Sequence, residues 1–481
     1  MKPFSAWLPG YPHCDGVTVR NITLDSREVD RNDVFIALKG LAFDGHDYID
    51  AAIKAGAVVI VAERPVADVS VPLVVLDNLR ARLGELAHAF YESPSEQLRL
   101  IGITGTNGKT STCQYIAQSL DFLGKRCGII GTNGQGLWGA LQETLNTTPD
   151  VVRLHRELAR QSDQGGQFCA MEVSSHGLDQ GRVAGVRYRT AVFTNLSRDH
   201  LDYHGTMDAY GKAKWQLLQW PGLQHAVVNL DDTWVQQHLG SISAQQVLTY
   251  GYTSEADIRV ISHRCNPAGI DALIATPWGQ TELNLPLLGL FNLSNALAAF
   301  AVLMTESVPI STAARVLSNL RPVSGRMEMF KLSAGPTVVV DYAHTPDALA
   351  KALQACRDHV SGRLGVIFGC GGDRDAGKRP EMAAVAEQGA DFVVITDDNP
   401  RHEVAAGILA DIRRGFVRPN EVTEISDRRS AIDLTLDRCG ADDVVLIAGK
   451  GHESYQEING KRHHFSDQAA VLAWQEVHHV E

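Results

Sequence analysis

The chain has 481 residues, enough for about three domains of roughly 150 residues each. Its net charge of −12, from 44 Lys and Arg against 56 Asp and Glu, argues against a general nucleic-acid-binding protein. The longest apolar stretches, such as Ala57–Ala62, are too short to span a bilayer, and the N-terminal stretch Met1–Gly16 lacks the apolar core of a secretory signal. The eight cysteines include no CxxC pair, which favours reduced thiols and a cytoplasmic protein.

Strand-like and helix-like stretches alternate through three segments of the chain. In residues 1–93 we expect strands at Val34–Leu38, Val58–Val61 and Leu73–Leu76 and a helix over Arg80–Glu92. A Ser-Pro-Ser boundary precedes the second segment, residues 94–329, which opens with the strand Leu98–Thr104. The third segment, residues 330–481, alternates helices with strands at Thr337–Val340, Leu364–Phe368, Phe392–Thr396 and Val444–Ala448. This alternation predicts α/β domains with mainly parallel sheets, in which ligands sit beyond the carboxyl ends of the strands.

The run Ile101–Thr110 has the sequence of a phosphate-binding loop. It follows an expected strand and precedes a helix expected from Ser111, so that backbone N–H groups and a helix N-terminus would face an anion. Lys109 would neutralise the outer phosphates, and the hydroxyl that follows it would hold Mg²⁺. The spacing is irregular, because Ile103 occupies the first glycine position of the usual pattern. We interpret the run as a nucleoside triphosphate site; the alternative is a glycine-rich turn with a surface lysine.

Other strand exits of the second segment carry candidate metal ligands. Glu172 ends an apolar strand, where it could hold a metal ion against phosphates, or could be a capping or solvated carboxylate. His200 follows a second apolar strand and is a further candidate ligand, although a lone histidine is more often packed or exposed. Lys212 and Lys214 lie in a helical stretch, where surface solubility alone would explain both.

Three strand exits of the third segment should converge on one sheet edge, at Phe368–Arg374, Asp397–Arg401 and Gly449–Glu453. Their glycines do not form a dinucleotide fingerprint, because Arg374 stands where the last glycine is needed. An arginine such as Arg401 can bind a carboxylate bidentately, and an acceptor such as Glu453 suits an ammonium group. The alternative is that Arg401 is a solvated turn residue.

Six motifs occur in order along the chain, at Gly102–Thr110, Asn146–Pro149, Glu172–His176, Asn195–Gly205, Phe291–Asn295 and Asp341–Pro346. Together they resemble the Mur ligase family of ATP-dependent amide-bond-forming enzymes over essentially the whole chain, and the irregular loop is also that family's variant. The resemblance implies three domains. These are a small α/β UDP-substrate-binding domain (1–93), a central P-loop ATPase-like domain with a mainly parallel sheet (94–329) and a Rossmann-like, amino-acid-binding domain (330–481).

The resemblance also implies a set of site residues. The catalytic residues would be Lys109, Glu172, His200 and Lys214. The ATP contacts would be Gly105, Thr106, Asn107, Gly108, Lys109, Thr110, Ser111, Asn292, Arg326 and Asp341. Mg²⁺ would be held by Thr110, Glu172, His200 and Lys214, the last as a carbamate formed with CO₂, with Lys212 as the nearby competitor for that role. The UDP-substrate contacts would be Leu24, Ser26, Thr147, Thr148, Ser174, Gln180 and Arg182. The meso-diaminopimelate contacts would be Arg374, Asp398, Asn399, Arg401, Gly449 and Glu453.

The activity implied is the addition of meso-diaminopimelate to UDP-N-acetylmuramoyl-L-alanyl-D-glutamate through an acyl phosphate, in peptidoglycan precursor synthesis. ATP is the co-substrate, and a cytoplasmic monomer is expected. The motif Asp398–Arg401 is that of the diaminopimelate-adding type, but His402–Ala405 replaces the acidic-proline pair that often follows it. The alternatives are a ligase adding L-lysine or another amino acid, an amide ligase that extends folate with glutamate, and a P-loop ATPase switch.

Overall fold

The structure is a computed structural model that describes residues 1–40, 43–144, 146–266, 268–333 and 335–478. The chain forms two compact units. One contains Met1–Tyr250 and Ala301–Thr305, and the other contains Gly251–Phe300 and Glu306–Glu481. The domain boundaries after residues 93 and 329 remain predictions.

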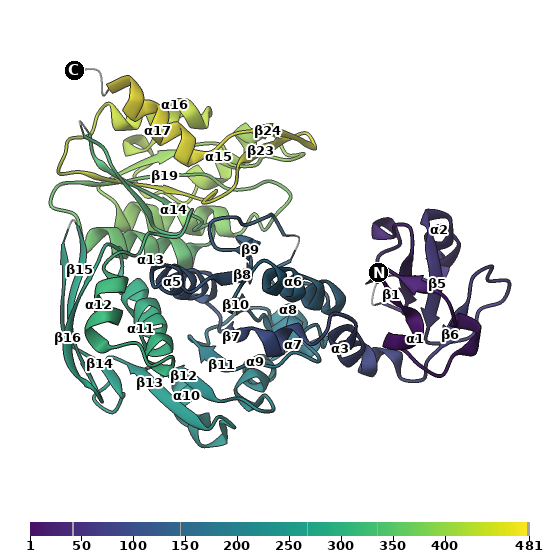
Figure 1. The fold of residues 1–481 in the computed structure, drawn as a ribbon. Coiled ribbons are helices and arrows are strands. Elements are labelled where there is room, and N and C mark those ends of the chain that lie inside the picture. The colour runs from purple at the N-terminus through teal and green to yellow at the C-terminus, as the bar shows by residue number, and fades with distance from the viewer. Residues whose placement is uncertain (41–42, 145, 267, 334, 479–481) are drawn as a thin grey trace. The chain divides into compact units, whose positions relative to one another are not determined.

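A parallel four-stranded sheet opens the first unit. Its strands, in spatial order, are β3 (Asn21–Thr23), β4 (Asp33–Ala37), β5 (Ala57–Ala62) and β6 (Leu73–Val75). Its main helices are α2 (Ile49–Ala55), which packs against β5 (Figure 1), and α3 (Leu79–Phe90). Val34 and Ile36 join one apolar cluster, and Phe35 and Ala37 join another. Both faces of β4 are therefore covered, which explains its unbroken apolar sequence.

The second sheet of this unit carries the phosphate loop. Among the residues described, this sheet has ten strands. Seven of them, in spatial order, are β13 (Gln246–Gly251), β12 (His225–Asn229), β11 (Thr190–Phe193), β7 (Arg99–Thr104), β10 (Phe168–Glu172), β8 (Cys127–Gly131) and β9 (Gly134–Leu137). The order continues beyond β13 with β14 (Ile258–Asn266), β15 (Gly269–Thr276) and β16 (Gly279–Leu285). Among the seven, the pairings between neighbours are parallel except for that of β8 with β9. Glu172 pairs with Ile103, and Phe193 pairs with Thr104, so three strands end at one edge.

Helices connect these strands. They are α5 (Lys109–Phe122), α6 (Val151–Asp163), α7 (Ser175–Asp179), α8 (Leu201–His204), α9 (Met207–Trp215) and α10 (Thr233–His238). Helix α5 packs on β8 and β10 (Figure 1). It begins at Lys109, two residues before the predicted start, because Gly108 adopts a φ of 82° and closes the loop immediately before the helix.

The second unit contains an antiparallel ribbon and a six-stranded sheet. The ribbon consists of β14, β15 and β16. It is followed by α11 (Leu290–Thr305), whose last residues, Ala301–Thr305, belong to the first unit, and by α12 (Ile310–Leu317). The sheet has the order β17 (Glu328–Lys331), β18 (Thr337–Asp341), β22 (Val444–Ala448), β19 (Leu364–Phe368), β20 (Phe392–Ile395) and β21 (Thr423–Glu424). All its pairings are parallel except that of β17 with β18.

Helices cover both faces of this sheet. One face packs on α13 (Pro346–Arg357), α14 (Lys378–Gly389) and α15 (Ala405–Arg413), and the other on α16 (Arg428–Leu436) and α17 (Asp467–His478) (Figure 1). Alternate residues serve the two faces: Val366 and Phe368 join one apolar cluster, and Ile367 joins the other. A hairpin of β23 (Tyr455–Ile458) and β24 (Lys461–His464) lies between β22 and α17 in the sequence.

Two further observations concern the chain as a whole. All eight cysteines are free thiols. Among the residues described, none of the helices combines the length and the hydropathy that crossing a bilayer requires.

Candidate functional site

The phosphate loop joins β7 to α5 with little room for side chains. Gly105 has a φ of 146°, and a Cβ placed there would lie 1.9 Å from the Thr194 hydroxyl oxygen. The loop is fixed from the neighbouring strand exit: the Asn107 N–H donates to Asn195 Oδ1 at 2.9 Å, and the Thr194 hydroxyl donates to the Asn107 carbonyl at 2.6 Å. No individual role was predicted for Thr194 or for Asn195, the first residue of one of the six motifs, although both directly follow β11.

Two lysine ammonium groups meet at one carbonyl of this loop. Lys109 Nζ donates to the carbonyl oxygens of Gly105 and Thr106, both at 2.8 Å. Lys214 Nζ, from α9, donates to the same Gly105 oxygen at 2.8 Å. Lys214 is only 1% exposed, and burial together with the charge of Lys109 lowers its pKa well below the ordinary lysine value.

The neighbouring lysine on α9 has a different environment. Lys212 is exposed and forms an i,i+4 ion pair with Asp208 at 2.7 Å. Residues two apart on a helix face in different directions, so only one of the two lysines can reach the loop. The structure brings Lys214, and not Lys212, to the phosphate loop.

Glu172 lies behind the loop as a buried carboxylate. Its Oε2 accepts from the Thr110 hydroxyl at 3.0 Å, and its Oε1 accepts from the Thr132 N–H at 2.8 Å. The Thr132 hydroxyl also lies 3.0 Å from that of Thr147, a predicted contact of the UDP-substrate. Thr132 was missed in the sequence, yet it stands directly after β8, so the rule of strand exits could have found it.

His200 lies among other histidines. It directly precedes α8 and has a φ of 51°. The centroid of the His176 ring lies 4.9 Å from that of His200 and 5.4 Å from that of His204. Burial, followed by the neighbouring His200, lowers the pKa of His176. Within the described residues, no three His, Cys, Asp or Glu side chains are grouped so as to hold a metal ion. The structure therefore joins Thr110 to Glu172 and Lys109 to Lys214, and leaves the metal role of His200 a prediction.

Thr106, a predicted ATP contact, connects the loop to the helices that follow. Its hydroxyl donates to the Ser197 carbonyl at 3.1 Å and lies 3.2 Å from the hydroxyl of Tyr210. The Tyr210 ring in turn lies under Lys214, with Nζ 4.6 Å from the ring centroid. Ser111, also predicted for ATP, lies in the first turn of α5 and is buried.

The predicted UDP-substrate residues of this sheet form one hydrogen-bonded group. The Thr148 hydroxyl donates to the Glu172 carbonyl at 3.0 Å and to Ser174 Oγ at 3.1 Å. Arg182 donates to the Thr148 carbonyl at 3.1 Å and to Gln180 Oε1 at 2.9 Å. These predicted substrate residues are therefore connected to the main chain of Glu172.

Leu24 and Ser26 lie in the N-terminal part of the same unit. Ser26 begins a 3₁₀ turn, Ser26–Glu28, that Asp25 caps through the Arg27 N–H. Arg153 on α6 bridges this turn, pairing with Glu28 at 2.6 Å and with Asp25 at 3.4 Å. These ion pairs connect the turn to the helix that follows Thr147 and Thr148.

The three remaining predicted ATP residues belong to the second unit. Asp341 ends β18 and accepts from the N–H groups of Met327 at 2.8 Å and Ala343 at 2.9 Å, and its burial raises its pKa. Arg326 stacks over the Tyr342 ring at 4.9 Å. Its buried Nε has no hydrogen-bond partner among the described atoms. Asn292, in α11, donates to the Leu288 carbonyl at 2.9 Å.

The ends of β20 and β22 meet at one edge, as their parallel pairing with β19 requires. A buried lysine, Lys450, lies at their centre, with Nζ 3.1 Å from Asn399 Oδ1, 3.3 Å from Glu453 Oε2 and 3.5 Å from Asp398 Oδ1. The adjacent Gly449 has a φ of 118°, and a Cβ there would lie 3.3 Å from Asp398. No role was predicted for Lys450 within the strand exit Gly449–Glu453.

Arg401 reaches the exit of β19. Its Nη1 donates to the Gly372 carbonyl at 2.7 Å, and its Nε lies 3.5 Å from Glu457. These contacts leave the Nη2 group unengaged among the described residues. Arg374 is exposed on the same exit, and a Cβ on Gly371 would approach both arginine side chains. The structure brings Asp398, Asn399 and Glu453 into contact through Lys450, while Arg401 and Arg374 flank the exit of β19.

The unusual residues after Arg401 have defined partners. His402 pairs with Asp373 at 2.8 Å, and Glu403 accepts from the Asp373 N–H at 2.6 Å. Glu403 also pairs with the buried Arg379 at 2.9 Å. Glu403 therefore holds this loop against the exit of β19.

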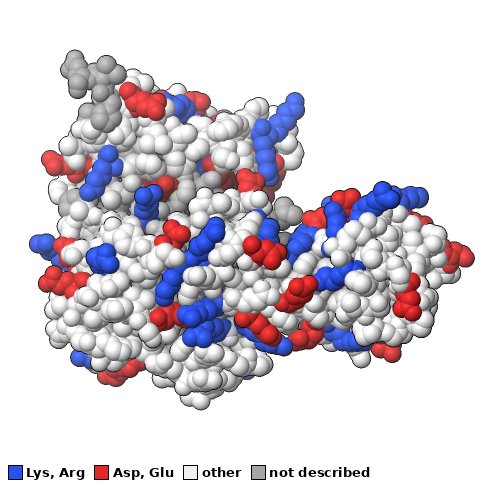
Figure 2. Space-filling model, viewed as in Figure 1, with Lys and Arg blue, Asp and Glu red and all other residues white. Residues whose placement is uncertain are grey.

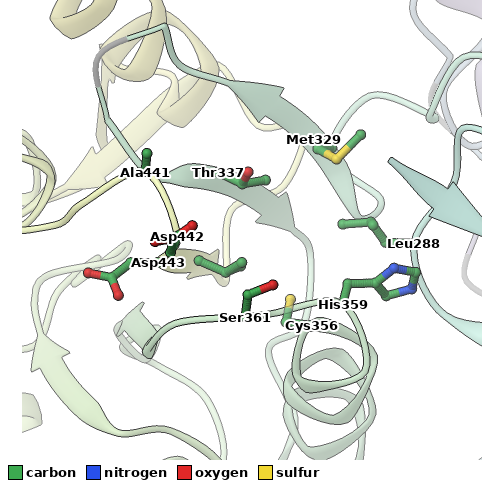
Figure 3. Close-up of a pocket in the computed structure, with 10 residues that line it drawn as sticks. Leu288, Met329, Thr337, Cys356, His359, Ser361, Ala441, Asp442 and Asp443 are labelled. Carbon is green, nitrogen blue, oxygen red and sulfur yellow. The ribbon is translucent and has the colours of Figure 1, made fainter. Parts of the chain in front are cut away.

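A small cavity of about 100 Å³ lies at the opposite end of the six-stranded sheet (Figure 3). Thr337 and Val444, the first residues of β18 and β22, line it together with Cys356. His359 also lines it, but both its ring nitrogens are engaged, by the Gly289 N–H at 3.1 Å and the Asn266 carbonyl at 2.7 Å. The cavity therefore lies away from the predicted site. On the face shown in Figure 2, basic and acidic side chains are interspersed.

The chain was compared with known proteins. Three family descriptions match it: "Mur ligase family, catalytic domain" over residues 18–91, "Mur ligase middle domain" over 103–303 and "Mur ligase, glutamate ligase domain" over 325–451. UDP-N-acetylmuramoyl-L-alanyl-D-glutamate–2,6-diaminopimelate ligases of Pseudomonas aeruginosa and Ectopseudomonas mendocina are 50% and 48% identical to it, with 96% and 99% of both chains covered. A solved structure of a ligase with that name is 37% identical, covers 100% of both chains and has a TM-score of 0.76. The chain therefore belongs to the Mur ligase family.

Proposed function

We propose that this chain is an ATP-dependent amide ligase that adds meso-diaminopimelate to UDP-N-acetylmuramoyl-L-alanyl-D-glutamate in peptidoglycan precursor synthesis. The observation that carries the proposal is the phosphate loop, where two lysines meet at the Gly105 carbonyl and a buried carboxylate accepts from Thr110. The near-complete match to ligases named for this reaction supports the same function.

The chemistry requires the D-Glu γ-carboxylate to be activated, because oxide is too poor a leaving group for attack by an amine. The carboxylate would attack the γ-phosphorus of ATP, giving an acyl phosphate and ADP. The amine of diaminopimelate would then attack the acyl carbon, and the tetrahedral intermediate would expel phosphate. Both steps bring anions together, so the task of Lys109 is to offset their repulsion and the task of the loop N–H groups is to orient the phosphates.

The residues that fit Mg²⁺ are the Thr110 hydroxyl and Glu172, oxygen donors of the type that this ion prefers. Mg²⁺ bound there would neutralise charge on the phosphoryl oxygens. His200 and a carbamylated Lys214 complete the proposed set. The Thr110–Glu172 hydrogen bond already orients both side chains toward each other.

The setting of Lys214 supports its carbamylation. The lowered pKa leaves the amine neutral at a lower pH than an exposed lysine, and the neutral amine is the form that adds to CO₂, releasing one proton. Two ammonium groups at one carbonyl also repel each other. Replacing one of these charges with a carbamate would convert that repulsion into attraction.

The specificity for diaminopimelate is proposed to depend on Arg401. Diaminopimelate carries one more carboxylate than lysine, and Arg401 has Nη2 available to meet it. The ammonium group of the substrate would lie by Asp398 and Glu453. With lysine bound in place of diaminopimelate, the Arg401 guanidinium would lack its carboxylate partner, at a cost of about 3–5 kcal/mol.

Replacement of this arginine gives a direct test. Arg401→Ala should raise the KM for meso-diaminopimelate roughly 100-fold, since truncating one member of a hydrogen-bonded charge pair costs about 2–5 kcal/mol. The KM for ATP should stay near that of the wild type. Steady-state kinetics with each substrate varied in turn measures both values. Arg414→Ala, at an exposed arginine of the same unit, is the matched control; equal KM values for the two variants would contradict the role of Arg401.

The experiment that tests the proposed function is a product assay. Purified protein is given ATP, UDP-N-acetylmuramoyl-L-alanyl-D-glutamate and either meso-diaminopimelate or L-lysine, and the products are identified by mass. We expect the tripeptide product with diaminopimelate, together with ADP and phosphate. Turnover with L-lysine but not with meso-diaminopimelate would make lysine the amino-acid substrate. ATP hydrolysis in the absence of both the UDP-substrate and the amino acid would favour an ATPase switch.

The free thiols suggest the cellular compartment in which the enzyme works. Eight free cysteines are typical of a reducing compartment, so we place the enzyme in the cytoplasm. We also propose that it acts as a monomer. Its proposed partners are the small-molecule substrates.

A further inference from the structure

A buried ion pair lies directly behind the edge that carries the proposed diaminopimelate contacts. Arg428 and Asp467, the first residues of α16 and α17, are both 0% exposed. The guanidinium is bound in a bidentate manner, with Nε 2.7 Å from Oδ1 and Nη2 2.8 Å from Oδ2. The charge of Arg428 is thereby neutralised by a residue outside the loops that bear the site.

The remaining donors of Arg428 are directed at those loops. Nη2 donates to the Ala448 carbonyl at 3.0 Å, and Nη1 lies 3.5 Å from the Asp397 carbonyl. Ala448 is the last residue of β22 and directly precedes Gly449, while Asp397 directly precedes Asp398. One planar group therefore contacts the backbone at the point where each site-bearing loop begins.

The loop after β20 has a second attachment to the same helix start. The Asp397 N–H donates to the Ser426 carbonyl at 3.1 Å, and Ser426 Oγ donates to Asp397 Oδ2 at 2.7 Å. The segment that enters α16 thus holds this exit through both backbone and side chain. Lys450 then connects the two loops through their side chains, on the ligand side.

Stability alone does not explain such a pair. Taking two charges out of water is costly, and replacing a buried pair with apolar residues is often neutral or stabilising. An arginine has five donors in a rigid plane, so it can hold two carbonyls at a fixed separation, as an apolar side chain cannot.

We propose that Arg428, held by Asp467, is a positioning residue that keeps the loops Asp398–Arg401 and Gly449–Glu453 in the mutual register needed to bind the amino-acid substrate. The inference rests on the proposed function for the identity of that substrate. Arg428 is buried behind the edge and acts through the two carbonyls. Displacing one loop by about 1 Å would separate the groups proposed to bind the substrate and would also misplace the attacking amine. Binding should weaken, and a misplacement of that size can cost a further factor of about 100 in rate.

The test removes both charges together, as Arg428→Met with Asp467→Leu, so that no buried charge is left unpaired. We expect a thermal midpoint within a few degrees of the wild type and a KM for meso-diaminopimelate raised about 10- to 100-fold, with the KM for ATP unchanged. Arg428→Lys is the second variant. It keeps the charge opposite Asp467 but cannot hold both carbonyls, so the same rise in KM is expected.

The matched control is the ion pair at the other end of the same strands. Arg363, just before β19, pairs with Asp443, just before β22, at 2.8 Å. Arg363→Met should leave the KM for diaminopimelate unchanged. If this control raises the KM as much as the double variant does, the positioning role of Arg428 is overturned.

Amide hydrogen exchange supplies a readout that does not depend on the substrate. In the double variant we expect faster exchange in residues 398–401 and 449–453, but not in residues 364–368 of the central strand β19. Unchanged exchange in both loops would overturn the proposal whichever amino acid the enzyme uses. If the wild-type protein fails to use diaminopimelate while the loops of the variant exchange faster, the assigned substrate is wrong and the positioning role stands.

Discussion

Lys109→Ala should reduce acyl-phosphate formation by about 10³-fold, the upper range for removing one preorganised group that stabilises the transition-state charge. Lys109 Nζ is held at two carbonyls of the phosphate loop, at the N-terminus of α5. Among the described lysines, only Lys214 also donates to the Gly105 carbonyl, and its carbamylation is proposed to make it an anion. The variant should therefore leave the γ-phosphoryl group without its nearest protein cation.

The measurement is the rate of ADP release, together with trapping of the acyl phosphate by hydroxylamine in the absence of diaminopimelate. Binding of the UDP-substrate, followed by calorimetry, should be retained, because Thr148, Ser174 and Arg182 are held by one another. Lys125→Ala, just beyond the other end of α5, is the matched control. Wild-type amounts of trapped product from the Lys109 variant would remove this lysine from the mechanism.

Lys214→Ala should lose about 10²- to 10³-fold in kcat, and short-chain acids such as acetate or propionate should restore part of it. The variant loses both the proposed carbamate and the buried contact to Gly105, but only the first of these can be replaced by an added carboxylate. Rescue by acid therefore separates the chemical role from a structural one. A ¹³C resonance of a carbamate in wild-type protein prepared with labelled bicarbonate gives an independent measurement.

The neighbouring lysine supplies the control for this prediction. Lys212→Ala should retain full activity, because its ammonium is exposed and paired with Asp208. If Lys214→Ala kept wild-type activity, no carbamate at that position would be needed. If the Lys212 variant lost activity and responded to acids, the carbamate would have to be reassigned.

The strand exits show how far the sequence could predict the site. An apolar run followed by a polar residue marks the end of a buried parallel strand, so Glu172 and Asp398 could be predicted at sheet edges, where they now lie. The strands predicted at Leu364–Phe368 and Val444–Ala448 have the observed bounds, since both faces are covered by helices and the whole run is apolar. In such segments local sequence and tertiary burial agree.

Other features depend on contacts between distant parts of the chain. Which of Lys212 and Lys214 reaches the phosphate loop depends on how α9 is oriented against that loop, which lies about a hundred residues earlier in the sequence. Nothing in the local sequence distinguishes either lysine from a surface residue. The role of Lys450 could not be predicted, because its partners Asn399 and Glu453 come into contact with it only after the sheet has formed. The start of α5 was placed late because the φ of Gly108 decides it.

The shared Gly105 oxygen has a thermodynamic consequence. Carbamylation would change the charge of Lys214, which is proposed to help hold the metal–nucleotide complex. Binding of carbon dioxide and binding of nucleotide would then be coupled through the Gly105 carbonyl that Lys109 and Lys214 share. Coupling between equilibria is reciprocal, so nucleotide should raise the affinity for carbon dioxide by the same factor by which carbon dioxide raises the affinity for nucleotide. Dissolved gas would then act as an effector of cell-wall synthesis, and degassed buffer should weaken the retention of ADP.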